Sequence, residues 1–271
     1  MKLPIWLIDT FTSIPFRGNP TAVCCSNEEL AGQTMQSVAH ELNCPVTAFI
    51  KTKTGVAGAY DIRYFTPVTE IPACGHATLA SVAFITQGKN KNVNITFYTA
   101  NGIAIETTTN SDLIMMSYQV YQMNNCAVSN EMMDALHLKM YRMAGYSTNL
   151  ETLFIEIDSP GILRTIQPDY QKLVRCGDQV KEVVVTWASG DEDYDYLLRS
   201  FCPWIGIDED PVTGSVHSVL GNFWKERLGK NNMVAYQASA RGGEIFIRAF
   251  DNNVEIGGRS VIFLKGEITV N

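Results

Sequence analysis

Two short segments hold the side chains best suited to moving a proton. In the first, Cys74 and His76 flank a glycine, and in the second Asp210 closes a run of three acids directly before Pro211. Each segment precedes a pattern typical of a helix start, and a helix N-terminus lowers the pKa of a nearby thiol or imidazole. Proton removal from carbon needs a base and a separately placed acid. The sequence therefore predicts Asp210, His76 and Cys74 as candidate catalytic residues.

The same two segments are predicted to bind an anion. Gly75 opens one expected helix, and Gly214, followed by Ser215, opens the other. The first N–H groups of a helix have no partner within it, and the helix dipole favours negative charge there. Glycine lets a ligand approach the backbone closely. Two such helix starts that converge would hold a small carboxylate substrate and stabilise the enolate-like charge that forms when a proton leaves the neighbouring carbon.

Each of these residues also has a plain structural interpretation. Cysteine is among the most buried residue types, so Cys74 can simply fill space. The acids at 208–210 can form a solvated turn in which Asp210 starts a helix ahead of Pro211. His76, taken alone, is equally compatible with packing and with chemistry. The functional interpretation is favoured because these residues occupy matching places in an internal repeat.

The repeat consists of ordered matches at a nearly constant offset. Residues 60–67, Tyr-Asp-Ile-Arg-Tyr-Phe-Thr-Pro, are matched by Tyr-Asp at 194–195 and by Arg-Ser-Phe-Cys-Pro at 199–203, with the shared phenylalanines 136 positions apart. Further on, Ala-Asn-Gly at 100–102 is matched by Ala-Arg-Gly at 240–242, an offset of 140. Self-similarity at half the chain length predicts two lobes of the same architecture.

Each lobe is expected to contain one long helix among many strands. Helices are predicted from Gly75 to Gly88 and from Gly214 to Gly229, with glycine as the C-terminal stop. The first helix is apolar on nearly all sides, which indicates burial. Short β-type runs surround both helices, at 5–12, 48–51, 60–65, 93–98, 113–120, 153–157, 182–187, 245–250 and 261–264. The prediction is an α+β fold of two pseudo-symmetric lobes, each a mixed β-sheet wrapped around a central helix.

The length and composition suit two packed domains. The 271 residues divide into two halves of about 130 residues, an ordinary domain size. With 46% hydrophobic and 18% charged residues, the chain has the composition of a packed globule. We expect the N-terminal lobe at 1–118 and the C-terminal lobe at 126–260, with a last strand near 261–271 that can pack back on the first lobe.

Charge and cysteine usage exclude several classes of partner. The net charge of −7 argues against binding of nucleic acid or of an anionic membrane. No apolar run approaches the roughly 20 residues of a membrane span, and residues 1–12, with Pro4 and Asp9, are typical of a strand rather than a signal peptide. The seven cysteines form no C-x-x-C pair. This usage predicts a cytoplasmic protein without a disulfide framework or a structural zinc site.

Taken together, these segments resemble the phenazine-biosynthesis F-type (PhzF-like) isomerase family, which shares its fold with diaminopimelate epimerase and proline racemase. The resemblance implies a homodimer without metal or organic cofactor. It implies catalytic roles for His76 and Asp210, a substrate-site role for the hydroxyl of Ser215, and a place near the substrate for Asn19. The matching segments cover almost the whole chain, at 9–11, 16–20, 41–43, 47–49, 64–67, 74–78, 209–215 and 237–243.

Two departures from the family pattern bear on the mechanism. Isomerases of the family read Ser-Glu-Thr-Ala-Phe, with the glutamate as the carbon base, whereas this chain has Val46 in that place. Valine cannot accept a proton, and loss of a catalytic base costs roughly 10²–10⁴-fold in rate. The related epimerases use two cysteines that face each other. Cys74 corresponds to the first, but the second position falls at about Pro211, so the resemblance implies an asymmetric site here.

Three explanations of Val46 stay open at this level. One of the three candidate catalytic residues acts as the base in altered chemistry. A nearby carboxylate, Glu41 or Glu70, takes its place, although Glu41 is expected on a preceding helix and directed elsewhere. Or the protein binds a ligand without converting it.

Three functional hypotheses follow. The first is a cofactor-independent isomerase or epimerase that acts by proton transfer at carbon on a small carboxylated metabolite. The second is a catalytically impaired binding or regulatory protein of the same fold. The third, a hydrolase or other thiol-dependent enzyme that uses Cys74 and His76, is disfavoured because the two residues lie only two positions apart.

Overall fold

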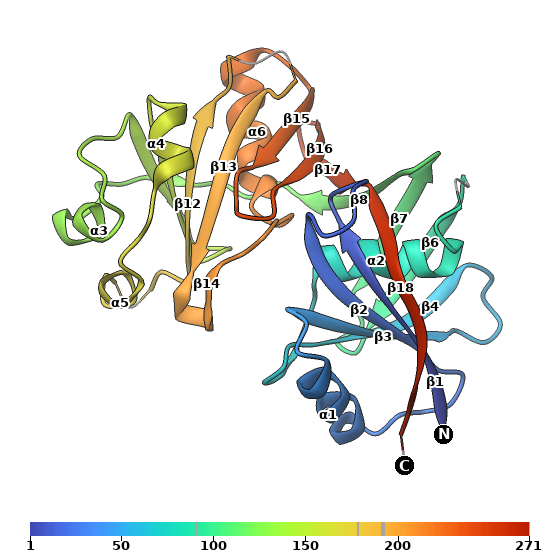
Figure 1. The fold of residues 1–271 in the computed structure, drawn as a ribbon. Helices are drawn as coiled ribbons and strands as arrows, with labels where there is room; N and C mark the ends of the chain where they lie inside the picture. The colour runs from blue at the N-terminus through green and yellow to red at the C-terminus, as the bar shows by residue number, and fades with distance from the viewer. Residues whose placement is uncertain (90–91, 178, 191–192, 271) are drawn as a thin grey trace. The chain divides into compact units, whose positions relative to one another are not determined.

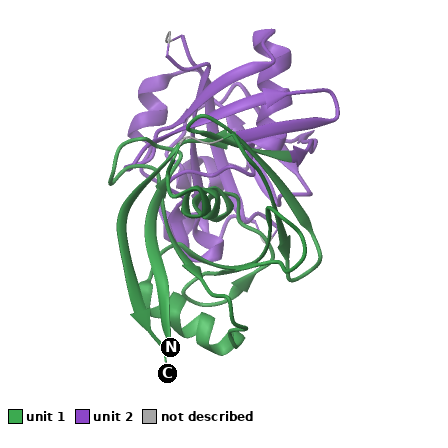
Figure 2. Ribbon diagram, turned by 90° about the vertical axis from the view of Figure 1, so that its right-hand side faces the viewer, with its two compact units in different colours: residues 1–117, 257–271 green, residues 118–256 purple. Residues whose placement is uncertain are grey.

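The structure, a computed structural model, describes residues 1–89, 92–177, 179–190 and 193–270. The chain forms two compact units, unit 1 of residues 1–117 and 257–271 and unit 2 of residues 118–256 (Figure 2). Unit 2 therefore begins at 118 rather than at the expected 126, and residues 257–260, expected in the second lobe, belong to unit 1. Residue 271, the end of the last predicted strand, lies outside the described residues.

Unit 1 is built from a mixed sheet and two helices (Figure 1). The strand β1 pairs antiparallel with both β2 and β18, so the two ends of the chain share one sheet. The strand β2 runs parallel to β3, β3 antiparallel to β4, β4 parallel to β6, and β6 antiparallel to β7. The elements are β1 (Lys2–Thr10), β2 (Asn19–Cys25), α1 (Gly32–Leu42), β3 (Val46–Thr52), β4 (Ala59–Phe65), β5 (Glu70–Ile71), α2 (Gly75–Thr86), β6 (Asn94–Thr99), β7 (Ala104–Asn110), β8 (Leu113–Gln119) and β18 (Ser260–Thr269).

The helix α2 lies at the centre of unit 1. It packs against β1, β2, β3 and β18, and in Figure 2 the strands of unit 1 curve around a helix seen end-on. Its residues from Ala77 to Ala83 are all buried. Alanine and serine among them keep the helix thin, so strands can approach it from several sides. The helix ends at Gln87, which is left-handed at φ 57°, and Gly88, at φ 65°, closes the turn by bonding to the carbonyl of Ala83.

Unit 2 repeats this plan with added short helices. Its strand pairings follow the same order, with β10 antiparallel to β11, β11 parallel to β12, β12 antiparallel to β13, β13 parallel to β15, and β15 antiparallel to β16. The elements are β9 (Asn124–Asn125), α3 (Asn130–Ala135), β10 (Met143–Ser147), β11 (Thr152–Glu156), α4 (Pro160–Thr165), α5 (Tyr170–Leu173), β12 (Glu182–Ala188), β13 (Tyr196–Cys202), the 3₁₀ turn η1 (Pro203–Ile205), β14 (Ile207–Glu209), α6 (His217–Leu228), β15 (Asn232–Gln237), β16 (Gly243–Ala249) and β17 (Asn253–Gly258).

The central helix of unit 2 is α6. Seven of the eight residues from His217 to Trp224 are buried. Gly221 lies so close to β17 that an added Cβ would meet Val254 Cγ2 at 2.9 Å. A glycine at this position lets the strand lie directly on the helix. Both units are therefore sheets wrapped around a buried helix, which confirms the predicted α+β fold class.

The strand registers of the two units match residue by residue. In unit 1, Thr47 of β3 faces Phe65 of β4, and in unit 2, Val183 of β12 faces Phe201 of β13. Both strands keep the 136-residue offset that the repeated phenylalanine predicts. Position 46 in unit 1 therefore corresponds to position 182 in unit 2.

Two local predictions were wrong. The second long helix starts at His217 rather than Gly214, because residues 214–218 form tight turns in which each N–H bonds to the carbonyl three residues earlier. The list of predicted strands lacked β2, where Pro20 lies inside the strand and weakens its β-type pattern. It also lacked β7, β10, β13, β15 and β17. Within the described part of the chain, no helix is both long and apolar enough to cross a membrane.

Candidate functional site

In unit 1 the structure brings Asn19, Cys74 and His76 together. Asn19 begins β2 and is fully buried, whereas His76 lies in the first turn of α2 and is half-buried. The Asn19 amide nitrogen Nδ2 lies 3.3 Å from His76 Nδ1. An amide NH₂ can only donate, so Nδ1 accepts and the imidazole proton is on Nε2. Asn19 thus fixes the ring so that Nε2 offers an N–H.

The charge state of His76 follows from its surroundings. Desolvation lowers the pKa of His76 to about 4. The ring is therefore neutral across the physiological range, and burial, rather than the helix start named in the sequence analysis, is the cause. A neutral imidazole with its proton on Nε2 is a hydrogen-bond donor to a developing negative charge, but it is a weak base at neutral pH.

Cys74 contacts the same ring. It is the residue immediately before α2, with extended backbone and no capping bond from its side chain. Its Sγ lies 3.5 Å from both Nδ1 and Nε2 of His76. A position equidistant from the two nitrogens is in line with the lone pair of neither. The geometry is that of a contact rather than of an aligned thiol–imidazole pair for nucleophilic catalysis.

The start of α2 is anchored from the sheet. The first helical bond runs from the Thr78 N–H to the Cys74 carbonyl, at 3.0 Å, so the N–H groups of Gly75 and His76 precede the helical ladder. The Thr78 hydroxyl donates to the same carbonyl at 2.8 Å. Because the Thr78 hydroxyl has only one proton to donate, it acts as the acceptor for the Tyr64 hydroxyl, at 2.6 Å. Tyr64 of β4 thereby holds the first turn of the helix in place.

In unit 2 the loop from Asp210 to Ser215 lies between β14 and α6. The Asp210 N–H donates to the Ser200 carbonyl of β13 at 3.1 Å, and the Asp210 carbonyl accepts from Gln237 Nε2 at 2.6 Å. The side-chain oxygen of Gln237 in turn accepts from the Thr213 N–H at 2.9 Å. Both backbone groups of Asp210 are therefore bonded to neighbouring strands, and its half-buried carboxylate is presented by a fixed loop.

A second clamp holds the next residue of this loop. The Ser239 hydroxyl donates to the Pro211 carbonyl at 2.6 Å and accepts from the Gly242 N–H at 3.1 Å. Gly242 has φ 65°, and a Cβ there would lie 2.1 Å from the hydroxyl oxygen of Tyr236. Glycine is thus required at this turn for both its conformation and its size.

Gly214 and Ser215 lie directly before α6, in the tight turns that replace the predicted first helical turn. Gly214 is buried and Ser215 is exposed. The Ser215 hydroxyl lies 3.4 Å from that of Thr213. The first hydrogen bond of the turn is donated by the His217 N–H to the Gly214 carbonyl. The N–H groups of Ser215 and Val216 therefore precede the ladder, as expected at a helix start.

The three acids of the 208–210 run are separated by the structure. Asp208 is exposed, and Glu209 forms a two-pronged ion pair with Arg199, at 2.7 and 2.8 Å. Arg199 also donates to the carbonyls of Leu163 and Ile166. Glu209 is therefore engaged in holding the outer face of β13, and Asp210 is the one acid of the run on the loop that leads to α6.

The carboxylates considered as substitutes at position 46 are engaged or exposed. Val46 is buried at the start of β3. Glu41 is exposed on α1. Glu70 forms a two-pronged pair with Arg63, at 2.8 and 2.7 Å, and the guanidinium lowers the pKa of Glu70. An acid held ionised by an arginine is a poor acceptor of a proton from carbon.

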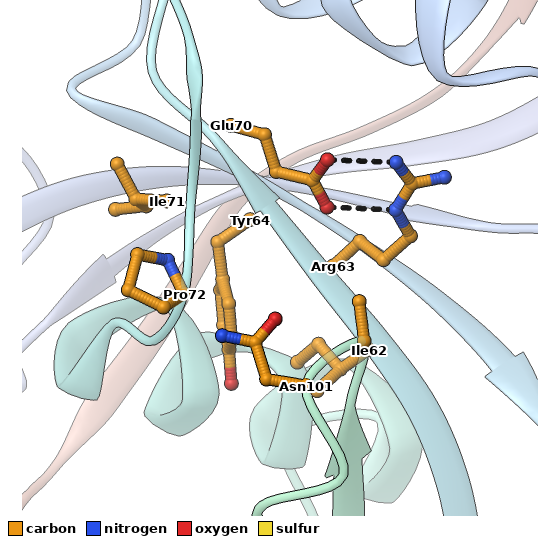
Figure 3. Close-up of a pocket in the computed structure, with 8 residues that line it drawn as sticks. Ile62, Arg63, Tyr64, Glu70, Ile71, Pro72 and Asn101 are labelled. Atoms are coloured by element: carbon orange, nitrogen blue, oxygen red, sulfur yellow. Dashed lines mark hydrogen bonds and ion pairs between the residues drawn. The ribbon is translucent and has the colours of Figure 1, made fainter.

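A pocket of about 290 Å³ lies beside this ion pair. Figure 3 shows Arg63 and Glu70 joined at its rim, with Tyr64, Pro72 and Asn101 around it. Because Glu70 neutralises Arg63, the pair adds little net attraction for an anion. The pocket is lined by β4, β5 and the turn after β6, on the segment of chain that leads into α2.

Sequence reasoning missed the residues that fix the loop of Asp210. Gln237 and Ser239 lie in the segment 237–243, which carries part of the family resemblance, yet they had no assigned role. Ser200 lies within the repeated segment at 199–203. A buried amide or hydroxyl 24 or more residues from its partner leaves no local pattern in the sequence, so only the repeat and the resemblance point to these positions.

Comparison with known proteins shows what the chain is similar to. The family model of the phenazine biosynthesis-like protein matches residues 8–266. A protein of Halalkalibacterium halodurans named an uncharacterized isomerase is 37% identical over 99% of each chain. A crystal structure of a PhzF-family phenazine biosynthesis protein from Enterococcus faecalis covers 100% of both chains, with a TM-score of 0.90 and 31% identity. A hydroxyproline epimerase of Agrobacterium vitis shares the fold alone, at a TM-score of 0.58 and 10% identity over 98% of this chain and 92% of its own.

Proposed function

This chain belongs to the phenazine biosynthesis-like (PhzF-like) family, and from that premise we propose that it is an isomerase that moves a proton at carbon on a small carboxylated metabolite. The observation that carries the proposal is the fixed Asp210 loop. Its backbone is bonded to two strands, so one carboxylate is presented in a defined place. Held carboxylates are suited to general acid–base chemistry because little reorganisation is needed during proton transfer.

In the proposed reaction Asp210 is the base. Its carboxylate takes the proton from a carbon next to the substrate carboxylate, and the electron pair of the C–H bond moves into an enolate-like system. The N–H on Nε2 of neutral His76 donates to the oxygen that gains negative charge. Asp210 then returns the proton to a carbon of the same system. No proton or electron is gained or lost overall, so the reaction is an isomerisation.

Substrate binding is assigned to the remaining residues of both loops. Gly75 and His76 supply backbone N–H groups in unit 1, while Gly214 and Ser215 supply the helix start and a hydroxyl in unit 2. Asn19 orients His76. These groups support a carboxylate ligand because N–H donors and helix N-termini favour an anion. Cys74 remains the weaker catalytic candidate, since its Sγ is not aligned with either nitrogen of His76.

The proposal includes the wider setting expected from the sequence. The enzyme works without metal or organic cofactor, as a homodimer, in the cytoplasm. Proton transfer by Asp210 and hydrogen bonding by His76 need no electron carrier, which supports the first point. Light scattering coupled to size-exclusion chromatography tests the second, with twice the chain mass expected. A stable monomer would overturn it.

The activity is tested by deuterium incorporation. Small carboxylates with an acidic C–H are incubated with the protein in D₂O, and exchange is followed by NMR and mass spectrometry. Wild type is expected to incorporate deuterium into at least one of them. Asp210→Asn should lower that rate by about 10²–10⁴-fold, whereas Asp208→Asn, an exposed acid two positions away, should leave it unchanged. Equal rates in the two variants would refute the role of Asp210.

One observation favours a second function, that of a binding protein. Val46 stands where the resemblance implies the carbon base, and its side chain is buried. On this alternative the protein binds small carboxylates and catalyses no exchange. Titration calorimetry would then show saturable binding without deuterium incorporation, and Val46→Glu would acquire exchange.

A further inference from the structure

A carboxyl group outside the residues discussed so far lies half-buried at the start of β12 in unit 2. Glu182 is the first residue of β12 and pairs with Thr152 of the parallel strand β11. The Ser200 hydroxyl of β13 makes a very short bond to Glu182 Oε1. The Thr152 Oγ1 lies 3.1 Å from Glu182 Oε2. Both carboxyl oxygens are thus bonded to hydroxyl groups, without a cation among the partners shown by the described residues.

Hydrogen-bond accounting indicates that this carboxyl carries a proton. Thr152 Oγ1 also lies 3.0 Å from the Leu150 carbonyl, which can only accept. A hydroxyl has one proton, so when Thr152 donates to Leu150 the bond to Glu182 Oε2 needs a proton from the carboxyl. Burial acts in the same direction, because desolvation raises the pKa of Glu182. Both observations favour the protonated form of the Glu182 carboxyl.

The other half of the molecule shows that the fold does not need an acid here. The position that corresponds to Glu182 in unit 1 is Val46, which pairs with Thr21 as Glu182 pairs with Thr152. The Thr21 hydroxyl is fully buried and has no hydrogen-bond partner among the described residues. The same backbone thus accepts an apolar residue at this position. A carboxyl group is costly to bury, so its presence in unit 2 calls for a reason other than folding.

The surroundings of Glu182 connect it to Asp210. Ser200, whose hydroxyl donates to Glu182, accepts the Asp210 N–H at its carbonyl. Cys202, next on the same face of β13, is buried, and the charges of Asp210 and Glu182 add to desolvation in raising the pKa of its thiol. Ser200 therefore contacts both residues, Glu182 through its hydroxyl and Asp210 through its carbonyl.

The other titratable groups near Glu182 are accounted for. Glu209 of β14 acts on Cys202 more weakly than Asp210 or Glu182 does, and Arg199 pairs with it on the outer face of β13. On the central helix α6, His217 is bonded to Tyr196, at 2.6 Å, and burial lowers the pKa of His217 to about 3. No cation is thus available to stabilise an ionised Glu182 among these groups, so a charge formed there acts on Cys202.

We propose that Glu182 is a positioning residue for Asp210: its bond to the Ser200 hydroxyl fixes Ser200, and hence the Asp210 backbone, and loss of its proton disturbs that arrangement. This inference rests on the proposed function for its consequence in catalysis, but the coupling of Glu182 to Asp210 is a property of the protein alone. When Glu182 loses its proton, the bond to Thr152 loses its donor. A second negative charge then lies near Asp210 and weakens binding of an anionic substrate.

Two substitutions separate this role from a structural one. Glu182→Gln preserves both bonds, because the amide oxygen accepts from Ser200 and the NH₂ donates to Thr152, but it cannot titrate. Glu182→Val places in unit 2 the residue that unit 1 already accepts at this position, and it removes both bonds. Glu156→Gln is the matched control, since Glu156 is a buried carboxyl of unit 2 but is paired with Arg142 and Arg227.

The first measurements are spectroscopic and are made on the protein without substrate. Infrared difference spectra of wild type against Glu182→Gln, at neutral pH, should show one carboxylic-acid C=O band that is lost in the variant. The NMR signal of the Asp210 amide should shift as the pH is raised and Glu182 loses its proton. The same shift should persist in Glu156→Gln and be absent in Glu182→Gln. An ionised Glu182 at neutral pH, or an Asp210 signal that titrates identically in wild type and Glu182→Gln, would overturn the proposal.

Turnover then provides a separate readout. In the deuterium assay Glu182→Val should lose on the order of 10²-fold in rate, because a misplaced catalytic group is costly, and Glu182→Gln should rescue most of that loss. Retained unfolding free energy in Glu182→Val would show that the loss is not a failure to fold. Full wild-type rate in Glu182→Val refutes the positioning role. If wild type exchanges no carboxylate at all, the proposed function fails, while the infrared and NMR results still decide the state of Glu182.

Discussion

The two units have the same strand register but differ in the side chains at corresponding strand positions. At corresponding positions unit 1 has Val46 and Tyr64, whereas unit 2 has Glu182 and Ser200. Tyr64 is large enough to reach the first turn of α2 and bond to Thr78. Ser200 is short and leaves room for a carboxyl beside it. The comparison shows that one duplicated backbone can hold a valine and a tyrosine in unit 1 and a carboxyl bonded to a serine in unit 2.

The same contrast appears in the ion pairs on the outer faces of β4 and β13. Arg63 and Glu70 in unit 1 correspond to Arg199 and Glu209 in unit 2, and each arginine lies over a phenylalanine. The side chains of the first pair are 30% and 37% exposed, and those of the second 10% and 16%. Burial should therefore make the same chemical pair weak in unit 1 and strong in unit 2.

The largest expected effect on stability is at Arg199. Arg199→Met should lower the free energy of unfolding by about 3–5 kcal/mol, because it leaves Glu209 partly buried without its cation. Arg63→Met in unit 1 should cost only about 0–1 kcal/mol, since that pair is more exposed to solvent. Urea unfolding followed by circular dichroism measures both. Equal losses in the two variants would show that the ion pairs of the two units are energetically equivalent.

The next largest effect is expected at His76. His76→Ala should lower the deuterium exchange rate by on the order of 10²-fold, the usual loss when one donor to a developing oxyanion is removed. His40→Ala, at an exposed histidine of α1, is the control and should leave the rate unchanged. An unaltered exchange rate in His76→Ala would show that His76 is not the donor to the developing oxyanion.

The pH dependence of His76 has a defined sign. Its pKa is lowered to about 4, so the unfolded chain binds a proton at this site more readily than the folded one. The contribution of His76 to stability is complete above the unfolded pKa of about 6.5 and is lost as the pH falls toward 4. The exchange rate should show no His76 inflection near pH 6.5. NMR titration of the ring protons checks this, and a midpoint near 6.5 would contradict it.

Much of this architecture could be predicted from the sequence, and the reason lies in the repeat. The matching phenylalanines at 65 and 201 already contain the offset that the strand registers show. The buried α2 follows from its uniformly apolar composition. The start of α6 could not be placed, because the turns at 214–218 have the same small residues as a helix start. Glu182 could not be recognised either, since its partners Thr152 and Ser200 lie 30 and 18 positions away.

The smallest effects are expected at the paired threonines. Thr152→Val in unit 2 should destabilise the protein by about 1–3 kcal/mol, because it removes a partner of the half-buried Glu182 and a bond to Leu150. Thr21→Val in unit 1 should leave stability unchanged or raise it by up to about 1 kcal/mol, since that buried hydroxyl has no partner among the described residues. Thermal unfolding of both variants under one condition decides the comparison. Similar losses would mean that Thr21 is also bonded in solution.

The central proposal is that the protein catalyses proton exchange at carbon although unit 1 has Val46 where the family resemblance implies a carbon base. Deuterium incorporation into a small carboxylate, measured side by side for wild type and Val46→Glu, tests it most directly. We predict that wild type, which has Val46, incorporates deuterium and that Asp210→Asn abolishes this incorporation. Binding of the carboxylate by wild type without any exchange, together with exchange gained in Val46→Glu, would contradict the account and identify a binding protein.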